Sequence, residues 1–153
     1  MKIKETYKTK EKIMNNSLTE EQVKVLNMSQ SVINEVRKVI IGKDEIIIKV
    51  LLSILAGGHI LIEDIPGVGK TTLAVALSKA LSLDYKRLQF TPDVLPTDVT
   101  GFTILNKETH KFEYKQGAAL TNLFLADEIN RTSSKTQSAL LEVMEEGKVT
   151  VDG

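Results

Sequence analysis

The chain contains no cysteine among its 153 residues. This absence excludes disulfide bonds, thiolate metal sites and a cysteine nucleophile. Histidine is almost as scarce, because His59 and His110 are two isolated residues. The sequence therefore argues against a metal centre built on sulfur or on several histidines.

Long apolar runs are absent as well. No run approaches the ~18 residues that a membrane-spanning helix needs, and the N-terminus is charged where a signal peptide has an apolar segment. The chain also has no excess of positive or negative charge, because 20 basic side chains balance 20 acidic ones. Such a balance gives no overall attraction to nucleic acid or to an anionic membrane. We predict a cytoplasmic protein that binds neither.

The residues that are present suffice for one domain. With 42% hydrophobic residues, a chain of this length can bury a core. We divide it into a disordered tail, residues 1–16, and a folded region, residues 17–153. The tail is rich in lysine and polar residues and shows little periodicity, and a basic nucleic-acid-binding arm is the alternative interpretation.

Helical and strand patterns alternate along the folded region. Thr19 and Gln22 form a capping-box pattern ahead of an amphipathic helix, and a second helix begins at Asp44. Later segments read in turn as a buried strand (59–63), a helix from about residue 70, a strand (85–90), a hairpin with its turn near 106–110 (102–117), a strand (122–128) and a helix (134–147). This order predicts an α/β fold with a mostly parallel sheet.

A glycine-rich stretch, EDIPGVGKTT at residues 63–72, joins the strand 59–63 to the following helix. A phosphate cradle needs converging backbone N–H groups, which glycines permit because they adopt unusual dihedral angles. The first amides and the dipole of the helix point at the same anion. We predict that Lys70 reaches the β- and γ-phosphates and that Thr71 holds Mg²⁺. The residues predicted to bind nucleotide here are Pro66, Gly67, Val68, Gly69, Lys70, Thr71 and Thr72.

This stretch departs from the strict pattern GxxxxGKT at one position, where Asp64 replaces the first glycine. Because PGVGKTT is intact, we expect the cradle to survive, with Asp64 altering only its entrance. A glycine-rich turn with an accidental lysine is the alternative interpretation. The position between a buried strand and an amphipathic helix argues against that alternative.

Two carboxylates end the predicted strand 122–128. We predict that Asp127 holds Mg²⁺ through water and that Glu128 polarises the attacking water, with Lys70 as the third catalytic residue. A solvent-facing carboxylate pair is the alternative, since Asp and Glu are mostly exposed. Parallel strands deliver their C-terminal ends to one edge, which brings the pair to the phosphate cradle and favours catalysis.

Three segments together resemble the MoxR family of AAA+ ATPases: GGHILIEDIPGVGKTTLA, RLQFTPDVLPTDVTG and NLFLADEINRTSSKTQSALLEVMEEGKVTVDG. The resemblance runs from about Ile33 to Gly153. It implies a P-loop NTPase fold, which is a three-layer α/β sandwich with a mostly parallel sheet and a β-hairpin insertion.

The resemblance also implies a function and its partners. ATP and Mg²⁺ are the cofactors, and full-length members form homo-oligomeric rings, expected to be hexamers. Their activity is chaperone-like remodelling or activation of client proteins, among them proteins with von Willebrand factor A domains. By the same resemblance Ile41 and Gly42 line the adenine pocket, although Lys43 stands where the family commonly has glutamine.

The hairpin 102–117 resembles an insertion that faces the pore of the ring in related proteins. Phe102, Phe112 and Tyr114 would then contact a client, and packing of the hairpin on its own sheet is the alternative. Arg131 follows the carboxylate pair. It either senses a neighbouring subunit's nucleotide or pairs with a surface carboxylate.

The resemblance stops at Gly153, before the first sensor strand, the arginine finger and the helical lid that family members carry. The family's sheet order places an absent strand between the strand that enters the glycine-rich stretch and the strand that ends at Asp127. We therefore expect residues 17–153 to be a partial ATPase core, truncated before the first sensor, with unpaired strand edges. By itself this chain should hydrolyse ATP weakly or not at all.

Two other functions fit part of the pattern. A P-loop kinase for a small molecule would need a lid with several arginines, and the region between the cradle and Asp127 offers only Arg87. A nucleotide-binding interaction module without turnover would not need Glu128. Truncation favours this module for the chain by itself, whereas the intact Lys70 and Glu128 favour an ATPase as the complete form.

Overall fold

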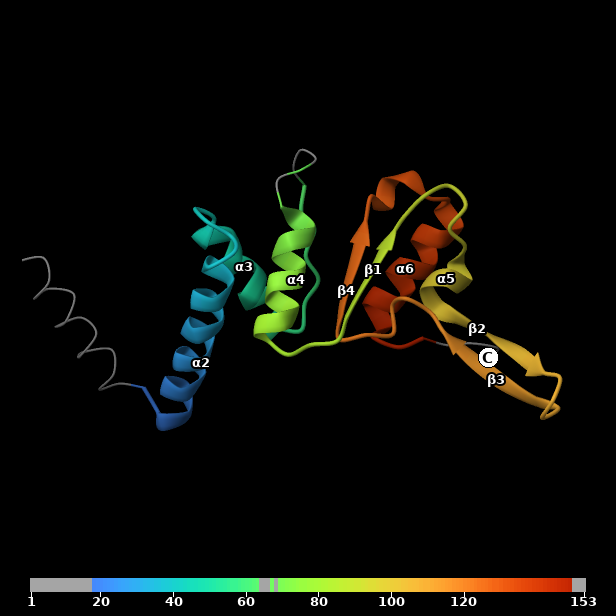
Figure 1. Cartoon of the computed structure of the whole chain (residues 1–153), viewed down its shortest axis with the longest axis horizontal. Coiled ribbons are helices and arrows are strands. Elements are labelled where there is room, and N and C mark those ends of the chain that lie inside the picture. Colours follow the sequence, from blue (N-terminus) through green and yellow to red (C-terminus); the bar gives the residue numbers. More distant parts are fainter. Residues whose placement is uncertain (1–17, 64–66, 68, 150–153) are drawn as a thin grey trace, which may run out of the picture.

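The structure, a computed structural model, describes residues 18–63, 67 and 69–149 (Figure 1). The predicted tail 1–16 lies outside these residues, as do Asp64, Pro66 and Val68 of the glycine-rich stretch. The described elements are α2 (Glu20–Arg37), α3 (Asp44–Leu55), α4 (Lys70–Ala80), β1 (Tyr85–Gln89), α5 (Pro96–Thr100), β2 (Gly101–Asn106), β3 (Lys111–Gln116), β4 (Leu123–Asp127), the 3₁₀ turn η1 (Ile129–Arg131) and α6 (Ser134–Glu146).

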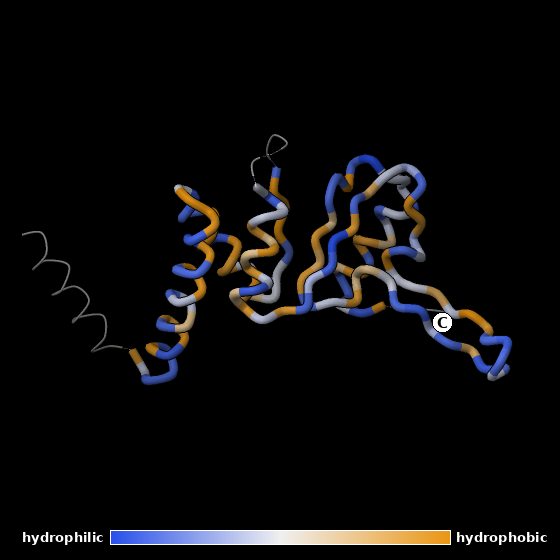
Figure 2. The backbone as a smooth tube through the Cα atoms, viewed as in Figure 1, coloured by the Kyte–Doolittle hydropathy of each residue, from blue (hydrophilic) through white to orange (hydrophobic). Residues whose placement is uncertain are grey.

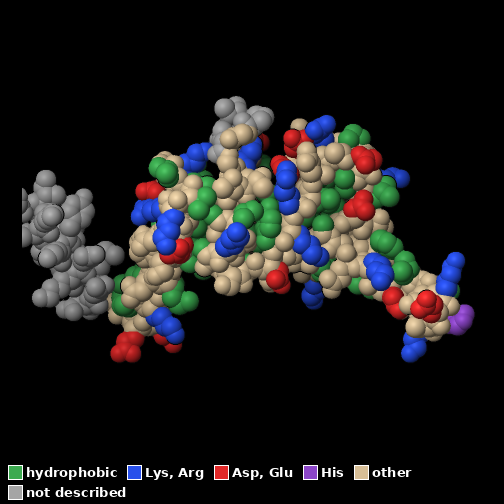
Figure 3. Space-filling model, in the orientation of Figure 1, with side chains coloured by type: hydrophobic (Ala, Val, Ile, Leu, Met, Phe, Trp, Pro, Cys, Tyr) green, Lys and Arg blue, Asp and Glu red, His purple; other side chains and the backbone are tan. Residues whose placement is uncertain are grey.

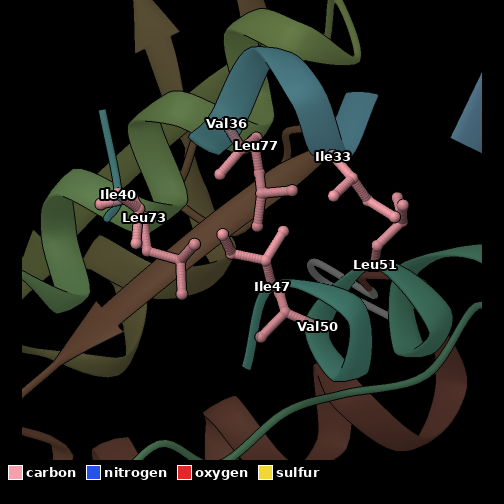
Figure 4. Close-up of a cluster of buried hydrophobic side chains, with 8 residues drawn as sticks. All are labelled: Ile33, Val36, Ile40, Ile47, Val50, Leu51, Leu73 and Leu77. Atoms are coloured by element: carbon pink, nitrogen blue, oxygen red, sulfur yellow. The ribbon is translucent and has the colours of Figure 1, made fainter. Parts of the chain in front are cut away.

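Three helices, α2, α3 and α4, pack together in the first half of the molecule. α2 begins with the predicted capping box: the backbone N–H of Gln22 donates to Thr19 Oγ1 at 3.3 Å, and the N–H of Thr19 donates to Gln22 Oε1 at 2.9 Å. Aliphatic side chains from the three helices and the turn after α2 meet in a buried cluster (Figure 4). Its members are Ile33, Val36, Ile40, Ile47, Val50, Leu51, Leu73 and Leu77. This cluster holds α4 against α2 and α3 through Leu73 and Leu77.

β1 and β4 form a parallel pair in the second half of the molecule, with Tyr85 opposite Leu123 and Gln89 opposite Asp127. α5 and α6 lie on one side of this pair, and α4 lies on the other side with α2 and α3 beyond it (Figure 1). A second buried cluster joins the pair to α5 and α6 through Phe90, Val94, Val99 and Leu140. The predicted α/β fold, with a parallel sheet, helices on both sides and a hairpin insertion, is confirmed.

The short helix α5 was not predicted, because the segment 91–101 contains two prolines, Pro92 and Pro96, and reads as a loop. Pro96 occupies the first turn of α5, where the missing proline N–H costs no hydrogen bond. Asp98 completes the helix start by accepting the backbone N–H of Leu95 at 2.8 Å. The buried Thr136 of α6 then donates to the carbonyl of Val94 at 2.8 Å, which fixes α6 to this segment.

β2 and β3 form the predicted hairpin, with Gly101 opposite Gln116 and Asn106 opposite Lys111. Asn106 Oδ1 accepts the backbone N–H of Glu108 at 2.9 Å, so the turn forms where the sequence predicts it. The hairpin projects away from the helices (Figure 1), and charged side chains gather at its tip (Figure 3).

The prediction of a strand at residues 59–63 is wrong, because this segment pairs with no described strand. Strand structure requires a neighbour that binds the backbone N–H and C=O groups. β4 is bonded to β1, and the two hairpin strands are bonded to each other. The side chain of Leu61 is correspondingly 71% exposed, whereas Ile62 packs on the first buried cluster. Apolar composition alone therefore does not make this segment a strand.

Hydropathy follows the two clusters. Figure 2 shows β4 as mostly hydrophobic and β1 beside it as more hydrophilic. α3 is the most apolar of the longer helices, but it has only 12 residues. Within the described part of the chain, no helix combines the length and the apolar content that crossing a membrane requires.

The Tyr85 hydroxyl is buried and has no hydrogen-bond partner among the described residues. Desolvation of this hydroxyl raises the pKa of Tyr85. Because an unsatisfied buried hydroxyl costs about 1–3 kcal/mol, Tyr85→Phe is expected to raise the free energy of unfolding by about 1 kcal/mol. Urea denaturation followed by circular dichroism measures this change, and a loss of stability would show that the hydroxyl has a partner.

Candidate nucleotide-binding and hydrolysis site

Several chain ends meet at one edge of the molecule. The N-terminus of α4, the C-terminal ends of β1 and β4, and the connection between α2 and α3 all lie at the upper edge in Figure 1. Parallel pairing of β1 and β4 aligns their C-terminal ends, as the sequence analysis expects. The predicted cradle and the predicted carboxylates therefore share this edge.

Gly67 and Gly69 both have positive φ, at 85° and 89°. Side-chain-bearing residues rarely adopt these angles, so glycine is required at both positions by conformation. Gly69 is the N-cap of α4 and offers no side chain to cap the helix. The N-terminus of α4, with the positive end of its dipole, is therefore not capped by a side chain of Gly69, and such a helix start suits an anion.

The remaining cradle residues differ in accessibility. Lys70 and Thr71 are half-buried in the first turn of α4, and Thr72 is exposed beside them. Pro66 and Val68, also predicted to bind nucleotide, lie outside the described residues. The described part of the cradle therefore combines two glycines in the left-handed region with a helix N-terminus that carries a lysine and two hydroxyls.

Asp127 lies on the face of the sheet that is turned toward α4. Side chains alternate between the two faces of a strand. Leu88 and Ala126 pack into the second cluster beside α6, whereas Leu123 and Leu125 line a groove beside α4. Asp127 follows Leu125 by two residues, so it shares the groove face at the end of β4.

Arg87 pairs with Asp127. Its Nη2 donates to Asp127 Oδ2 at 2.7 Å, and its Nε donates to the same oxygen at 3.2 Å. Sequence reasoning noted Arg87 only as evidence against a kinase and missed this contact. Nothing in the sequence reports it, because the pairing of β1 with β4 is not local.

Glu128 adopts the left-handed conformation, with φ 57° and ψ 43°. A residue other than glycine held in this region costs on the order of 1–3 kcal/mol, and such residues cluster at functional sites. The Glu128 carboxylate accepts Arg131 Nη1 at 2.6 Å, and the 3₁₀ turn η1 connects the two residues. Gln137 of α6 donates to the carbonyl of Ile129 at 3.0 Å and so holds this turn on the helix. Of the two predicted roles for Arg131, this structure shows pairing with a carboxylate.

The groove between α4 and β4 opens into a cavity of about 630 Å³. Apolar side chains from α3, α4 and β4 form much of its wall, and Lys70 is the predicted site residue that lines it. Asp127, Glu128 and Thr71 lie outside the lining. The cavity therefore lies next to the candidate site and does not include its carboxylates.

The predicted adenine-contacting residues lie in the connection between α2 and α3. Ile41 is 86% exposed, and Gly42 has a φ of 74°. This connection lies at the same edge as the start of α4 (Figure 1). Ile41 is thus an exposed aliphatic side chain at this edge, and its contact with adenine stays a prediction.

The hairpin aromatics and the histidines are not part of this edge. Phe112 is 77% exposed and Phe102 is 44% exposed, whereas the Tyr114 hydroxyl donates to the carbonyl of Thr100 at the base of the hairpin. His110 lies in the hairpin turn, as predicted, and the His59 ring is 2.9 Å from the carbonyl of Met144 in α6. The site therefore depends on neither histidine.

The oxygen donors of the site suit magnesium. Thr71 offers a hydroxyl and Asp127 a carboxylate, and Mg²⁺ is usually held by one or two side chains together with substrate phosphates. Within residues 18–63 and 67–149, apart from Val68, no three histidine, cysteine or acidic side chains gather to hold a metal by themselves. This donor set fits a magnesium ion that accompanies a nucleotide.

Comparisons with known proteins agree with this geometry. The family model described as "ATPase family associated with various cellular activities (AAA)" matches residues 59–153. The uncharacterized protein YeaC of Bacillus subtilis is 58% identical over 121 residues, which cover 79% of this chain and 38% of YeaC. Chaperone MoxR1 of Mycobacterium tuberculosis is 41% identical over 119 residues, which cover 78% of this chain and 32% of MoxR1. A candidate ATPase from Cytophaga hutchinsonii, known from its crystal structure, is 48% identical, with a TM-score of 0.71 over 81% of this chain and 38% of that chain.

The chain therefore belongs to the AAA family of ATPases and, within it, to the MoxR proteins. This confirms the predicted family. The chain spans 38% of YeaC and 32% of MoxR1. The roles of individual site residues stay predictions.

Proposed function

We propose that this chain binds ATP together with Mg²⁺ and that its site hydrolyses ATP. One observation carries the proposal: the pairing of β1 with β4 places Asp127 on the α4 face of the sheet, at the edge where α4 begins with Lys70. The left-handed Glu128 after Asp127 supports it, because a residue other than glycine keeps this conformation at a cost. The glycines before Lys70 support it as well, because they adopt the positive φ angles that a phosphate cradle uses.

The chemistry assigns a separate task to each side chain. The α4 amides and Lys70 would bind the β- and γ-phosphate oxygens, and Thr71 and Asp127 would hold Mg²⁺, which supplies neutralisation of the phosphate charge when it is bound. Glu128 would accept a proton from water while the water oxygen forms a bond to the γ-phosphorus. The bond between the γ-phosphorus and the bridging oxygen breaks, and ADP leaves with that oxygen.

Nucleotide binding tests the cradle directly. Lys70→Ala is expected to weaken ATP binding roughly 10- to 100-fold, because a hydrogen bond to a charged group contributes about 1.5–3 kcal/mol. Titration of a fluorescent ATP analogue into this chain, with Mg²⁺ present, measures the dissociation constant. Lys79→Ala is the matched control, because Lys79 is an exposed lysine in the last turn of the same helix. Equal affinity of the Lys70→Ala variant and the unchanged chain would contradict the predicted cradle.

The biological setting is proposed from the family. A relative named Chaperone MoxR1 supports chaperone-like remodelling of client proteins. To this proposal we add a place in the cytoplasm and a homo-oligomeric ring, which the family resemblance implies for the full-length protein. Proteins with von Willebrand factor A domains are the expected clients. The projecting hairpin, with Phe112 77% exposed, is the part of this chain that we assign to client contact.

A further inference from the structure

The carboxylate of Asp127 is held by a side chain from another strand. Arg87 lies opposite Leu125 in the parallel register, and Gln89 lies opposite Asp127. Arg87 therefore reaches diagonally across the pair, by the distance of two residues along β4, to the end of the strand. This diagonal contact exists only because β1 and β4 are neighbours.

The geometry of the pair is asymmetric. Nη2 and Nε of Arg87 both donate to Oδ2 of Asp127, at 2.7 and 3.2 Å. A guanidinium that served only to neutralise the carboxylate would most often bind both oxygens in a fork. Here Arg87 fixes Oδ2, and Oδ1 takes no part in this contact.

A contribution to folding stability does not explain the ion pair between Arg87 and Asp127 well. The side chains are 41% exposed for Arg87 and 24% exposed for Asp127. Ion pairs with this much solvent access contribute little to folding, because water screens them and ordering two side chains costs entropy. The effect that remains is control of the orientation of the carboxylate.

We propose that Arg87 is a positioning residue, which holds Asp127 so that Oδ1 is directed to the magnesium of a bound nucleotide. The inference rests on the proposed function, because it needs Asp127 to act toward Mg²⁺. Hydrogen-bond partners of metal-binding carboxylates fix their orientation, and their loss commonly costs tenfold or more in metal affinity. Arg87 would perform this task without touching the nucleotide.

Magnesium dependence of nucleotide binding tests the inference. The dissociation constant of a fluorescent ADP analogue is measured on the full chain over a series of free Mg²⁺ concentrations and with EDTA. The magnesium effect is the change in this dissociation constant between EDTA and saturating Mg²⁺. In Arg87→Gln, the free Mg²⁺ concentration that produces half of this change is expected to rise about tenfold. The affinity measured with EDTA should stay unchanged, because phosphate binding by α4 does not involve Arg87.

The matched control is Lys86→Gln, which removes a positive charge from the neighbouring position of β1. Lys86 points to the other face of the strand and donates to the carbonyl of Gly117 at 3.2 Å. The Lys86→Gln variant should show the same magnesium dependence of nucleotide binding as the unchanged chain. If Arg87→Gln does not fold, as judged by circular dichroism, Arg87→Lys takes its place, because it keeps the charge but has one nitrogen in place of the rigid guanidinium, which donates from both Nε and Nη2. It should show a smaller loss in the same direction.

The outcomes separate the two proposals. One outcome is that Arg87→Gln binds nucleotide and needs no more Mg²⁺ than the unchanged chain for half of the magnesium effect. This result overturns the positioning role of Arg87 and leaves the proposed function standing. If Arg87→Gln binds nucleotide more weakly by the same factor with Mg²⁺ and with EDTA, Arg87 is a structural residue. This result also overturns the positioning role. Absence of nucleotide binding by the unchanged chain overturns the proposed function, and the inference with it.

Discussion

Replacing Phe90 by alanine is expected to lower the free energy of unfolding by about 3–5 kcal/mol. Phe90 is 0% exposed and is the largest fully buried side chain in the part of the chain that the structure describes. It packs with Val94, Val99 and Leu140 in the cluster that joins the sheet to α5 and α6. Removal of the ring leaves a cavity that the two strands and α6 cannot fill without moving apart.

The same change should also disturb the candidate site. The backbone N–H of Phe90 donates to the carbonyl of Asp127 at 2.8 Å, at the point where β1 and β4 end. Urea denaturation followed by circular dichroism measures the loss of stability. Phe112→Ala is the control, because this ring is 77% exposed and its removal should change stability by less than about 0.5 kcal/mol. Similar values for the two variants would show that the second cluster is not packed as described.

Glu128→Gln is expected to lower the rate of ATP hydrolysis by about 10²- to 10⁴-fold, which is the usual contribution of a general base. Glutamine has nearly the same shape as glutamate and can still accept the hydrogen bond from Arg131, so the backbone at this position should be kept. The amide does not take up a proton from water. ATP should therefore stay bound at nearly unchanged affinity while its turnover is lost.

Hydrolysis is best measured in a chimera, because this chain spans only 38% of YeaC. The matched 121 residues of YeaC are replaced by those of this chain, and phosphate release is followed at saturating ATP. Glu142→Gln is the control, since Glu142 is an exposed glutamate on α6. Turnover that survives in Glu128→Gln removes Glu128 from the mechanism. Absence of turnover in a folded chimera with Glu128 intact argues against the proposed ATPase activity.

Local elements were predicted well, because their hydrogen bonds join residues that are close in the sequence. The Thr19–Gln22 capping box spans three residues, and the Ser133 cap of α6 accepts the N–H of Thr136 at 3.3 Å. The turn after Asn106 is likewise a local contact. The one missed helix, α5, has a local start as well, but two prolines obscured it.

Long-range pairing was beyond such reasoning. Residues 59–63 and residues 123–127 are both short apolar segments, and the sequence analysis predicted a strand for each. Only the second has a neighbour in the structure, because β1 pairs with it along its whole length. Whether an apolar segment is a strand depends on a partner that its own residues do not specify.

The amino-acid sequence by itself determined the chemical parts of this protein: the glycines and lysine of the cradle, the carboxylates after an apolar segment, and the MoxR family. Only the tertiary structure decided how the carboxylates are held. Arg87 reaches Asp127 because β1 and β4 lie in one parallel register. The physical reason is that residue types carry chemistry locally, whereas register and packing arise from contacts between segments far apart in the chain.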